Sequence, residues 1–346
     1  MKACVSIPVH EQPDVILDQI RNIRFYLPDA WIVLHVSGNF VWPFWGLFKR
    51  DFTELDGVLV NPDHLPTWSR WGSFVHVHNS NFRFAAGKVE FDHFIIHSSN
   101  DLLVRRGATD WMKDLDAACG LGVLSPDSTW VAAPRVFRDE AFRNIRRHFG
   151  VSEILTSQAE GTFYRREMFQ EIVDVIDRHY DFSVPAENYE RVETYYPTLA
   201  AKLANRIGRP YVFSELIGLP EIVPEVVELI RSQTLSKATL KEAYRNYRRT
   251  GYIPPSPGEW YKKALGEAKK LARAFLQIYR KGSLEKPAVK SALDIDPSTS
   301  YDVGHLYGVK RVERYLNHPL RRFIRSLLEK DRAEAFGTPT AQGAIS

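Results

Sequence analysis

Short apolar runs alternate with amphipathic stretches along the first 140 residues of the chain. The apolar runs have the length of buried strands, and they lie at 2–9, 31–36, 58–60, 92–96 and 130–136. Between these runs, apolar residues recur at helical spacing, which predicts helices at 13–25, 73–86 and 109–118. Such an alternation is typical of an α/β domain, so we expect a mostly parallel sheet with helices on both faces.

The sequence pattern predicts mainly helices in the second part of the chain. Helical spacing of apolar residues predicts helices at 167–178 and 193–205, and one more strand follows at 210–214. From about residue 222 the pattern is helical, it is interrupted by prolines at 254–257, and it ends in a helix at 309–330. Residues 282–304 are rich in Ser, Pro, Gly and Asp and predict a linker. We therefore expect one domain at 1–240 and a basic, mainly helical extension at 241–346.

Polar residues follow three of the predicted strands. In a parallel sheet the carboxyl ends of the strands line the ligand crevice, which is where His10, Ser37 and Asp101 would fall. Asp101 comes after the apolar part of FDHFIIHSSNDLLVRRG (91–107), and two arginines follow it. This order indicates the rim of an anion-binding cleft, although Asp101 could equally be the N-cap of a following helical turn.

Charge is spread unevenly along the chain. The whole chain has a formal net charge of +4, yet residues 240–346 hold 21 Lys and Arg against 11 Asp and Glu. A basic extension on an acidic body suggests an anionic partner, such as a membrane surface or a lipid-linked substrate. The alternative is a solvated helical face. Nucleic acid is not expected as a partner, because the basic segment lacks the interleaved glycines and stacking aromatics of known modules.

Cysteine content and the start of the chain bear on the compartment. Cys4 and Cys119 are too few for a disulfide framework, so a reducing compartment is expected. The opening apolar run is broken by Pro8 and His10, so no signal peptide is expected, and no apolar run has membrane-spanning length. We expect a cytoplasmic protein. The basic extension suggests that it could also bind peripherally to the inner face of the membrane.

The sequence lacks the motifs of several common enzyme classes. There is no glycine-rich phosphate loop and no G-x-S-x-G elbow. One Asp-x-Asp pair, Asp294 and Asp296, could hold a divalent cation, but it falls in the predicted linker and reads better as a solvated acidic turn. Four histidines could form a metal cluster or serve as hydrogen-bonded structural groups, and they are His76, His78, His93 and His97.

Glu193 is the most suggestive acidic residue of the second half. It opens a predicted helix and is followed by Tyr195 and Tyr196. A carboxylate beside aromatic rings is typical of a sugar subsite, and partial burial would raise its pKa towards that of a general base. The alternative is an ordinary first-turn glutamate that the helix dipole favours.

Six segments, in this order, resemble the core-2/I-branching N-acetylglucosaminyltransferase family, which includes peptide O-xylosyltransferases and bacterial relatives. The opening VSIPVHEQPDVILDQIRNI with WIVLHVSG is similar to its first strand-helix-strand unit. The remaining matches are Asn61 with WGSF, FIIHSSNDLLV, GTFYRREMFQEIV, VETYYPTL and SQTLSK. The resemblance covers about residues 1–240. The chain departs from the family pattern at Ser37, Asn100, Leu103 and Val192.

The resemblance implies a GT-A-like, Rossmann-type nucleotide-sugar fold and assigns roles to residues. Glu193 would be the catalytic base. Donor-binding residues would be His10, Ser37, Asp101, Lys237, Arg209 and Arg231. Acceptor-binding residues would be Trp71, Glu160, Tyr195 and Tyr196.

The implied reaction is an inverting transfer of a sugar such as GlcNAc or Xyl from a UDP-sugar, with no metal or other cofactor. The implied acceptor is a saccharide or a lipid-linked oligosaccharide in surface polysaccharide or glycoconjugate synthesis. Two alternatives stay open: a metal-dependent transferase, including a retaining one, and a non-catalytic protein that binds a nucleotide or glycan.

Overall fold

The computed structural model describes most of the first 204 residues and several shorter segments after them. The described residues are 1–9, 13–37, 52–63, 73–119, 122–128, 130, 132–181, 189–204, 217–218, 221–222, 301–302, 306–310, 312, 316 and 319–336. Contacts between residues divide the chain into two units. The first comprises Met1–Leu219 and His305–Arg311, and the second comprises Pro220–Gly304 and Val312–Ser346. A short segment of the expected C-terminal extension therefore belongs to the first unit.

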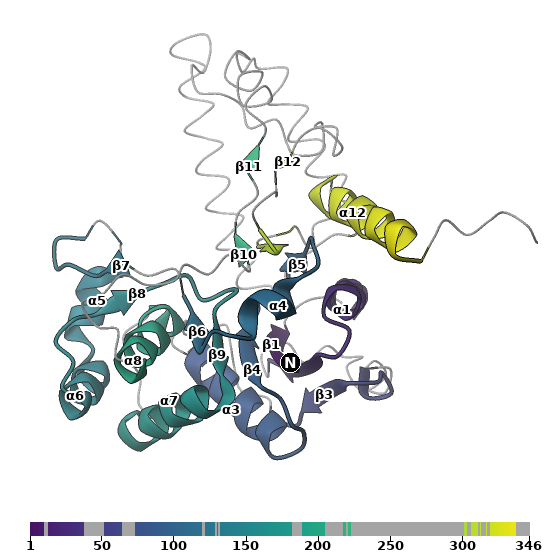
Figure 1. Cartoon of the computed structure of the whole chain (residues 1–346). Coiled ribbons are helices and arrows are strands. Elements are labelled where there is room, and N and C mark those ends of the chain that lie inside the picture. Colours follow the sequence, from purple (N-terminus) through teal and green to yellow (C-terminus); the bar gives the residue numbers. More distant parts are fainter. Residues whose placement is uncertain are drawn as a thin grey trace, which may run out of the picture. The chain divides into compact units, whose positions relative to one another are not determined.

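A six-stranded sheet forms the centre of the first unit (Figure 1). Its order is β3 (Val58–Asn61), β2 (Trp31–Val36), β1 (Ala3–Val9), β4 (His93–Ile96), β9 (Phe163–Arg165) and β6 (Ala117–Ala118). The first four strands are parallel, and β9 runs antiparallel to both β4 and β6. All seven residues of β1 are buried, so both faces of the sheet are covered there. The predicted α/β class with a mostly parallel sheet is confirmed.

Helices of the first unit follow the apolar spacing of the sequence. α1 (Pro13–Tyr26) and α3 (Ser73–Ala86) match their predicted ranges, and α7 (Arg166–His179) and α8 (Tyr195–Leu203) lie within two residues of theirs. The remaining elements are α4 (Ala108–Met112), α5 (Ala133–Arg138), α6 (Glu140–Phe149) and the 3-10 turn η2 (Arg191–Glu193). The Asp139 carboxylate caps α6 by accepting a hydrogen bond from the Phe142 amide at 3.1 Å, and Gly150 ends it at φ 62°.

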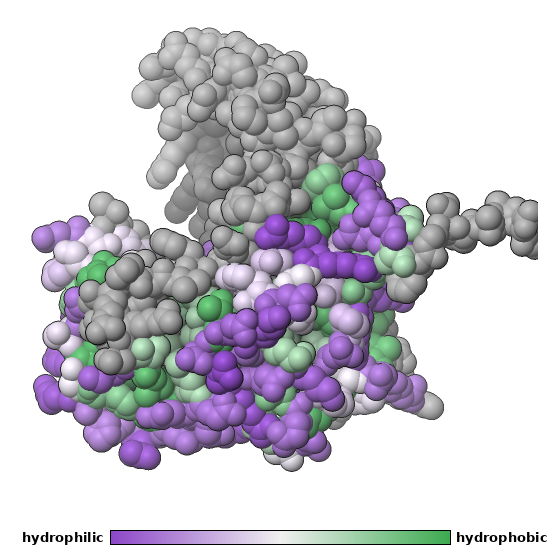
Figure 2. All heavy atoms as spheres, in the orientation of Figure 1, coloured by the Kyte–Doolittle hydropathy of each residue, from purple (hydrophilic) through white to green (hydrophobic). Residues whose placement is uncertain are grey.

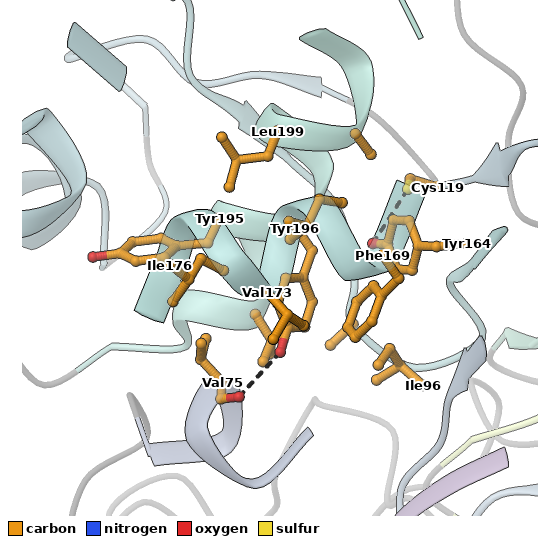
Figure 3. Close-up of a cluster of buried hydrophobic side chains, with 14 of the residues drawn as sticks. Val75, Ile96, Cys119, Tyr164, Phe169, Val173, Ile176, Tyr195, Tyr196 and Leu199 are labelled. Carbon is orange, nitrogen blue, oxygen red and sulfur yellow. Dashed lines mark hydrogen bonds between the residues drawn. The ribbon is translucent and has the colours of Figure 1, made fainter. Parts of the chain in front are cut away.

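Aromatic side chains dominate the core between the sheet and helices α3, α7 and α8 (Figure 3). Phe82 contacts Phe94 edge-on at 5.2 Å between ring centroids, and Phe94 stacks on Phe169 at 4.7 Å. Tyr196 lies in the same cluster, and its hydroxyl oxygen is within donating distance of the Val75 carbonyl oxygen at 3.1 Å and of Asn79 Oδ1 at 2.8 Å. Truncating one such ring to alanine typically costs about 3–5 kcal/mol, so the cluster is a main source of stability.

A small sheet joins the end of the chain to the first unit. Strand β13 (Gly308–Val309) pairs antiparallel with β5 (Leu102–Leu103) and parallel with β10 (Ile217–Gly218). Tyr307 fixes this segment, because its ring stacks on Trp111 at 5.6 Å and lies under the Arg105 guanidinium at 4.0 Å. The strand that follows Asp101 is thus paired with residues about 200 positions later in the sequence.

The second unit contains a short antiparallel pair, β11 (Glu221–Ile222) with β12 (Tyr301–Asp302), and the helix α12 (Pro319–Phe336). Among the described helices, none combines the length and apolar character needed to cross a bilayer. Figure 2 shows polar side chains over most of the visible face of the first unit. Met1 and Val123 are the large hydrophobic residues that are exposed in the described part of the chain.

Three predicted elements differ from the structure. Residues 133–138 form helix α5 instead of a strand, because Pro134 lies in the first turn, where it needs no hydrogen-bond donor. The predicted helix at 109–118 is the short α4 followed by β6, and the predicted final helix is α12, which begins ten residues later. Two short paired strands, β7 (Gly122–Val123) and β8 (Leu155–Thr156), were not predicted. The predicted strand at 210–214 and the Asp294–Asp296 pair lie outside the described residues.

Candidate functional site

The loop after β4 is a rigid turn at the carboxyl edge of the sheet. Asp101 Oδ2 accepts a hydrogen bond from the Ser98 amide at 2.7 Å. Gln19 Nε2, from α1, donates to the Ser98 carbonyl at 2.6 Å and to the Asp101 carbonyl at 2.9 Å. The Asp101 side chain is 1% exposed. Its carboxylate therefore holds the loop in shape, in a capping role within its own turn, and its predicted donor contact stays a prediction.

Two further edge positions follow neighbouring strands. The Ser37 amide, just after β2, donates to the Val9 carbonyl at 3.1 Å, and the His97 amide, just after β4, donates to the Ser6 carbonyl at 3.0 Å. Ser37 is therefore at the edge predicted for it, although it is buried. His10, which follows β1, lies outside the described residues.

The histidines serve as neutral hydrogen-bonding groups inside the fold. His78 Nδ1 lies 2.7 Å from Ser6 Oγ, and His93 Nε2 lies 2.7 Å from the Leu115 carbonyl oxygen. Burial lowers the pKa of His78 to about 3 and that of His97 to about 4, so both are uncharged at neutral pH. His78 and His93 thus make hydrogen bonds of the kind that the structural interpretation expects.

Glu160 faces the β4 loop from the neighbouring strand. It lies just before β9, which runs antiparallel to β4, so the start of β9 meets the carboxyl end of β4. Ser98 Oγ donates to Glu160 Oε1 at 3.3 Å, and Lys310 Nζ donates to Glu160 Oε2 at 3.2 Å. The predicted acceptor-binding residue Glu160 thus shares the edge with the β4 loop and with a cation from the end of the chain.

The turn η2 and the residue before it carry two more carboxyl groups, those of Glu193 and Glu190. The Glu193 carbonyl accepts from the Ser157 amide at 2.9 Å, and the Glu193 amide donates to the Glu190 carbonyl at 3.1 Å. Burial raises the pKa of Glu190 to about 9, and the negative charges of Glu193 and Glu160 add to this effect. At neutral pH Glu190 is therefore protonated, in the electrostatic field of the Glu193 and Glu160 carboxyl groups.

One buried carboxylate anchors the segment that carries Glu193. Asp139 Oδ2 accepts from Arg191 Nε at 2.8 Å, from the Tyr189 hydroxyl at 2.8 Å and from the Tyr195 hydroxyl at 3.1 Å. Arg191 is 1% exposed, so this ion pair is almost fully desolvated. Because Arg191 and Tyr195 lie two residues on either side of Glu193, their common partner fixes the backbone from which Glu193 projects.

The predicted acceptor role of Tyr195 and Tyr196 is wrong. Both side chains are fully buried and lie among other core residues (Figure 3). Tyr195 stacks on Phe142 at 4.3 Å with 14° between the ring planes. Their ring faces are covered by protein, so they cannot stack on a sugar. Aromatic residues at helical spacing more often belong to the core than to a ligand-binding surface, and Tyr195 and Tyr196 are core residues.

The remaining predicted residues lie outside the part that the structure describes: His10, Trp71, Arg209, Arg231 and Lys237. Sequence reasoning missed Ser98, Glu190 and Lys310. Glu190 had a local signal, because residues three apart eclipse one another in a 3-10 turn and ERVE places two glutamates at that spacing. Lys310 had none, since only the β13–β5 pairing brings it to the site.

The described residues contain no group of three His, Cys, Asp or Glu side chains arranged to hold a metal ion. The chemistry that the arrangement offers is that of carboxyl groups in two protonation states beside a buried ammonium group. A charged carboxylate can accept a proton, a neutral one can donate a hydrogen bond, and an ammonium can bind an anion.

Comparison with solved structures finds glycosyltransferases at low similarity. The mannosyltransferase PcManGT from Pyrobaculum calidifontis, in complex with GDP-Man and Mn²⁺, is 14% identical over 61% of this chain and 54% of its own, with a TM-score of 0.34. The galactosyltransferase LgtC, in complex with donor and acceptor sugar analogs, is 8% identical over 67% and 79%, with a TM-score of 0.36. The glycosyltransferase GlyE from Streptococcus pneumoniae TIGR4 is 12% identical over 62% and 45%, with a TM-score of 0.27.

This chain spans about half the length of PcManGT and of GlyE. TM-scores below 0.5 carry no argument about function, which therefore rests on the geometry of the site. No protein-family model and no curated protein matches the sequence.

Proposed function

We propose that the protein is an inverting glycosyltransferase of GT-A type that moves a sugar from a UDP-sugar to a saccharide acceptor. The observation that carries the proposal is a cluster of charges at the carboxyl edge of a mostly parallel sheet. Lys310 pairs with Glu160, and the charges of Glu193 and Glu160 both act on Glu190. This edge is where α/β sheets bind their ligands. A base for an attacking hydroxyl and a cation for a leaving diphosphate are the two charges that such a transfer needs.

Glu193 acts as the general base. The acceptor hydroxyl oxygen attacks the anomeric carbon from the face opposite the diphosphate, and its proton passes to the Glu193 carboxylate. The bond from the anomeric carbon to the diphosphate oxygen breaks, and UDP leaves with the electron pair, so the configuration inverts. Glu190 holds a proton at neutral pH, so its carboxyl group can donate a hydrogen bond beside Glu193.

The leaving diphosphate is stabilised by side-chain cations instead of a metal ion. Charge-assisted hydrogen bonds from Lys or Arg to phosphate oxygens lower the energy of the developing negative charge. The metal-dependent alternative differs in one measurable property, because chelation would stop turnover.

The acceptor is proposed to be a saccharide or lipid-linked oligosaccharide, in surface polysaccharide or glycoconjugate synthesis. The excess of basic residues in 240–346 supports a place beside an anionic membrane surface. GlcNAc and Xyl are the donor sugars that the sequence resemblance favours.

Thermal unfolding of the full chain with a panel of UDP-sugars tests this function. A ligand that binds only the folded form raises the melting temperature, so UDP and at least one UDP-sugar should stabilise the protein. GDP and ADP serve as matched controls with the same diphosphate. If no nucleotide shifts the melting temperature and no UDP is released with any donor and acceptor, the proposed function is wrong.

A further inference from the structure

Lys310 is a buried cation in an unusual position. Among the described residues of the first unit, Arg191 and Lys310 are the buried basic side chains, and Arg191 is held by Asp139. The Lys310 side chain is 8% exposed, whereas its partner Glu160 is 23% exposed. The Glu160 side of this pair therefore reaches solvent at the edge of the sheet.

Strand pairing fixes where Lys310 lies. In the antiparallel β13–β5 pair, Gly308 is opposite Leu103 and Val309 is opposite Leu102. One step further along this register, Lys310 meets Asp101, at the turn that follows β4. The Glu160 carboxylate lies between the Lys310 ammonium and Ser98 Oγ, at 3.2 Å and 3.3 Å. The strand pairing thus fixes the backbone of Lys310, and the Lys310 ammonium group lies at the carboxyl end of β4.

The Lys310–Glu160 pair meets solvent on the Glu160 side, so an anion can approach it from there. A single carboxylate on a lysine gives one charge-assisted hydrogen bond, and a diphosphate offers more oxygens and more negative charge for the same ammonium. The burial of the lysine strengthens its attraction for an anion, because little water competes for it. Ser98 Oγ, which also donates to Glu160, can turn to the same anion.

We infer that Lys310 binds the diphosphate of the nucleotide sugar, and that phosphate oxygens replace Glu160 as its partner. This inference rests on the proposed function and extends it. The released Glu160 carboxylate accepts hydrogen bonds from hydroxyl groups of the acceptor sugar, which is the role that the sequence suggested for it. Donor binding therefore prepares the acceptor site, and the enzyme binds the donor first.

Calorimetric titration of UDP and of uridine into the full chain and its variants tests the inference. Lys310→Met should weaken UDP binding by about 10- to 100-fold, the loss expected for a hydrogen bond to a charged group, and should leave uridine binding unchanged. Glu160→Gln should tighten UDP binding, because it removes the competing carboxylate. Lys113→Met is the matched control, since Lys113 is exposed on the surface of the first unit, and it should bind UDP as the wild type does.

The double variant Lys310→Met with Glu160→Gln covers the case in which an unpaired Glu160 destabilises the fold. It leaves no charge without a partner at this pair, and it should still bind UDP weakly. If Lys310→Met and the double variant bind UDP with wild-type affinity, the inference is wrong. The proposed transfer then needs another cation for the diphosphate, and it is tested separately by the activity of Glu193→Gln. If the wild type binds no UDP, both fall together.

Discussion

At the scale of single residues, the site depends on a difference between two neighbouring glutamates. Glu190 and Glu193 stand three positions apart on one tight turn, and burial favours the neutral form of Glu190. A neutral carboxyl group can donate a hydrogen bond, so Glu190 offers a donor at neutral pH beside the carboxyl group of Glu193.

The raised pKa of Glu190 predicts a particular dependence of stability on pH. A carboxyl group whose pKa is higher in the folded state binds its proton more tightly there, so the free energy of unfolding falls as pH rises from about 4.5 towards about 9. Glu190→Gln removes this loss. We expect the melting temperature of Glu190→Gln, relative to the wild type, to increase steadily between pH 5 and pH 8.

Glu167→Gln is the control for that measurement, because Glu167 is an exposed carboxylate on α7, away from the cluster. A difference between Glu190→Gln and the wild type that stays constant with pH, or matches the one seen for Glu167→Gln, would refute the assignment of the buried proton to Glu190.

At the scale of elements, helix α8 has a structural task. It presents Tyr196 to α3, where the hydroxyl bridges the Val75 carbonyl and Asn79 Oδ1, and it presents Tyr195 to Asp139. Both contacts tie α8 to elements far from it in the sequence. The helix thereby holds η2, which immediately precedes it, at a fixed distance from the sheet.

Tyr196→Phe measures the structural role of α8. The change removes the buried hydroxyl that lies 2.8 Å from Asn79 Oδ1 and 3.1 Å from the Val75 carbonyl oxygen, so we expect a loss of about 1–3 kcal/mol in the free energy of unfolding. The Michaelis constant for the acceptor should not change, because Tyr196 is buried in the core. Tyr307→Phe is the matched control, since it removes a hydroxyl from a half-buried ring. A raised Michaelis constant with unchanged stability would restore the sugar-stacking role.

Some elements of the fold could be predicted from the sequence, and others could not. Strands β1, β2 and β4 were predictable because their apolar residues form short continuous runs, as expected for strands buried on both faces. Residues 130–136 share that composition, and only Pro134 in the first turn of α5 distinguishes them. Apolar composition alone cannot separate a short buried helix from a buried strand.

At the scale of the whole molecule, the first unit is assembled from two distant parts of the chain. Residues 305–311 join Met1–Leu219 through β13, through the Tyr307 stack on Trp111 and through the Lys310–Glu160 ion pair. Local sequence patterns carry no information on such a pairing. The edge position of Ser37 and Asp101 could be predicted from the sequence, whereas the pairing of Lys310 with Glu160 could not.

In the proposed reaction, a carboxylate at position 193 drives sugar transfer without a metal ion. The deciding experiment compares Glu193→Gln with the wild type in excess EDTA, using a UDP-sugar and an acceptor found by screening, and measures UDP affinity on the same samples. We expect turnover by the wild type in EDTA and a loss of about 100- to 10,000-fold in Glu193→Gln, with UDP affinity unchanged. Full activity of Glu193→Gln, or wild-type turnover that stops in EDTA and returns with Mn²⁺, would contradict it.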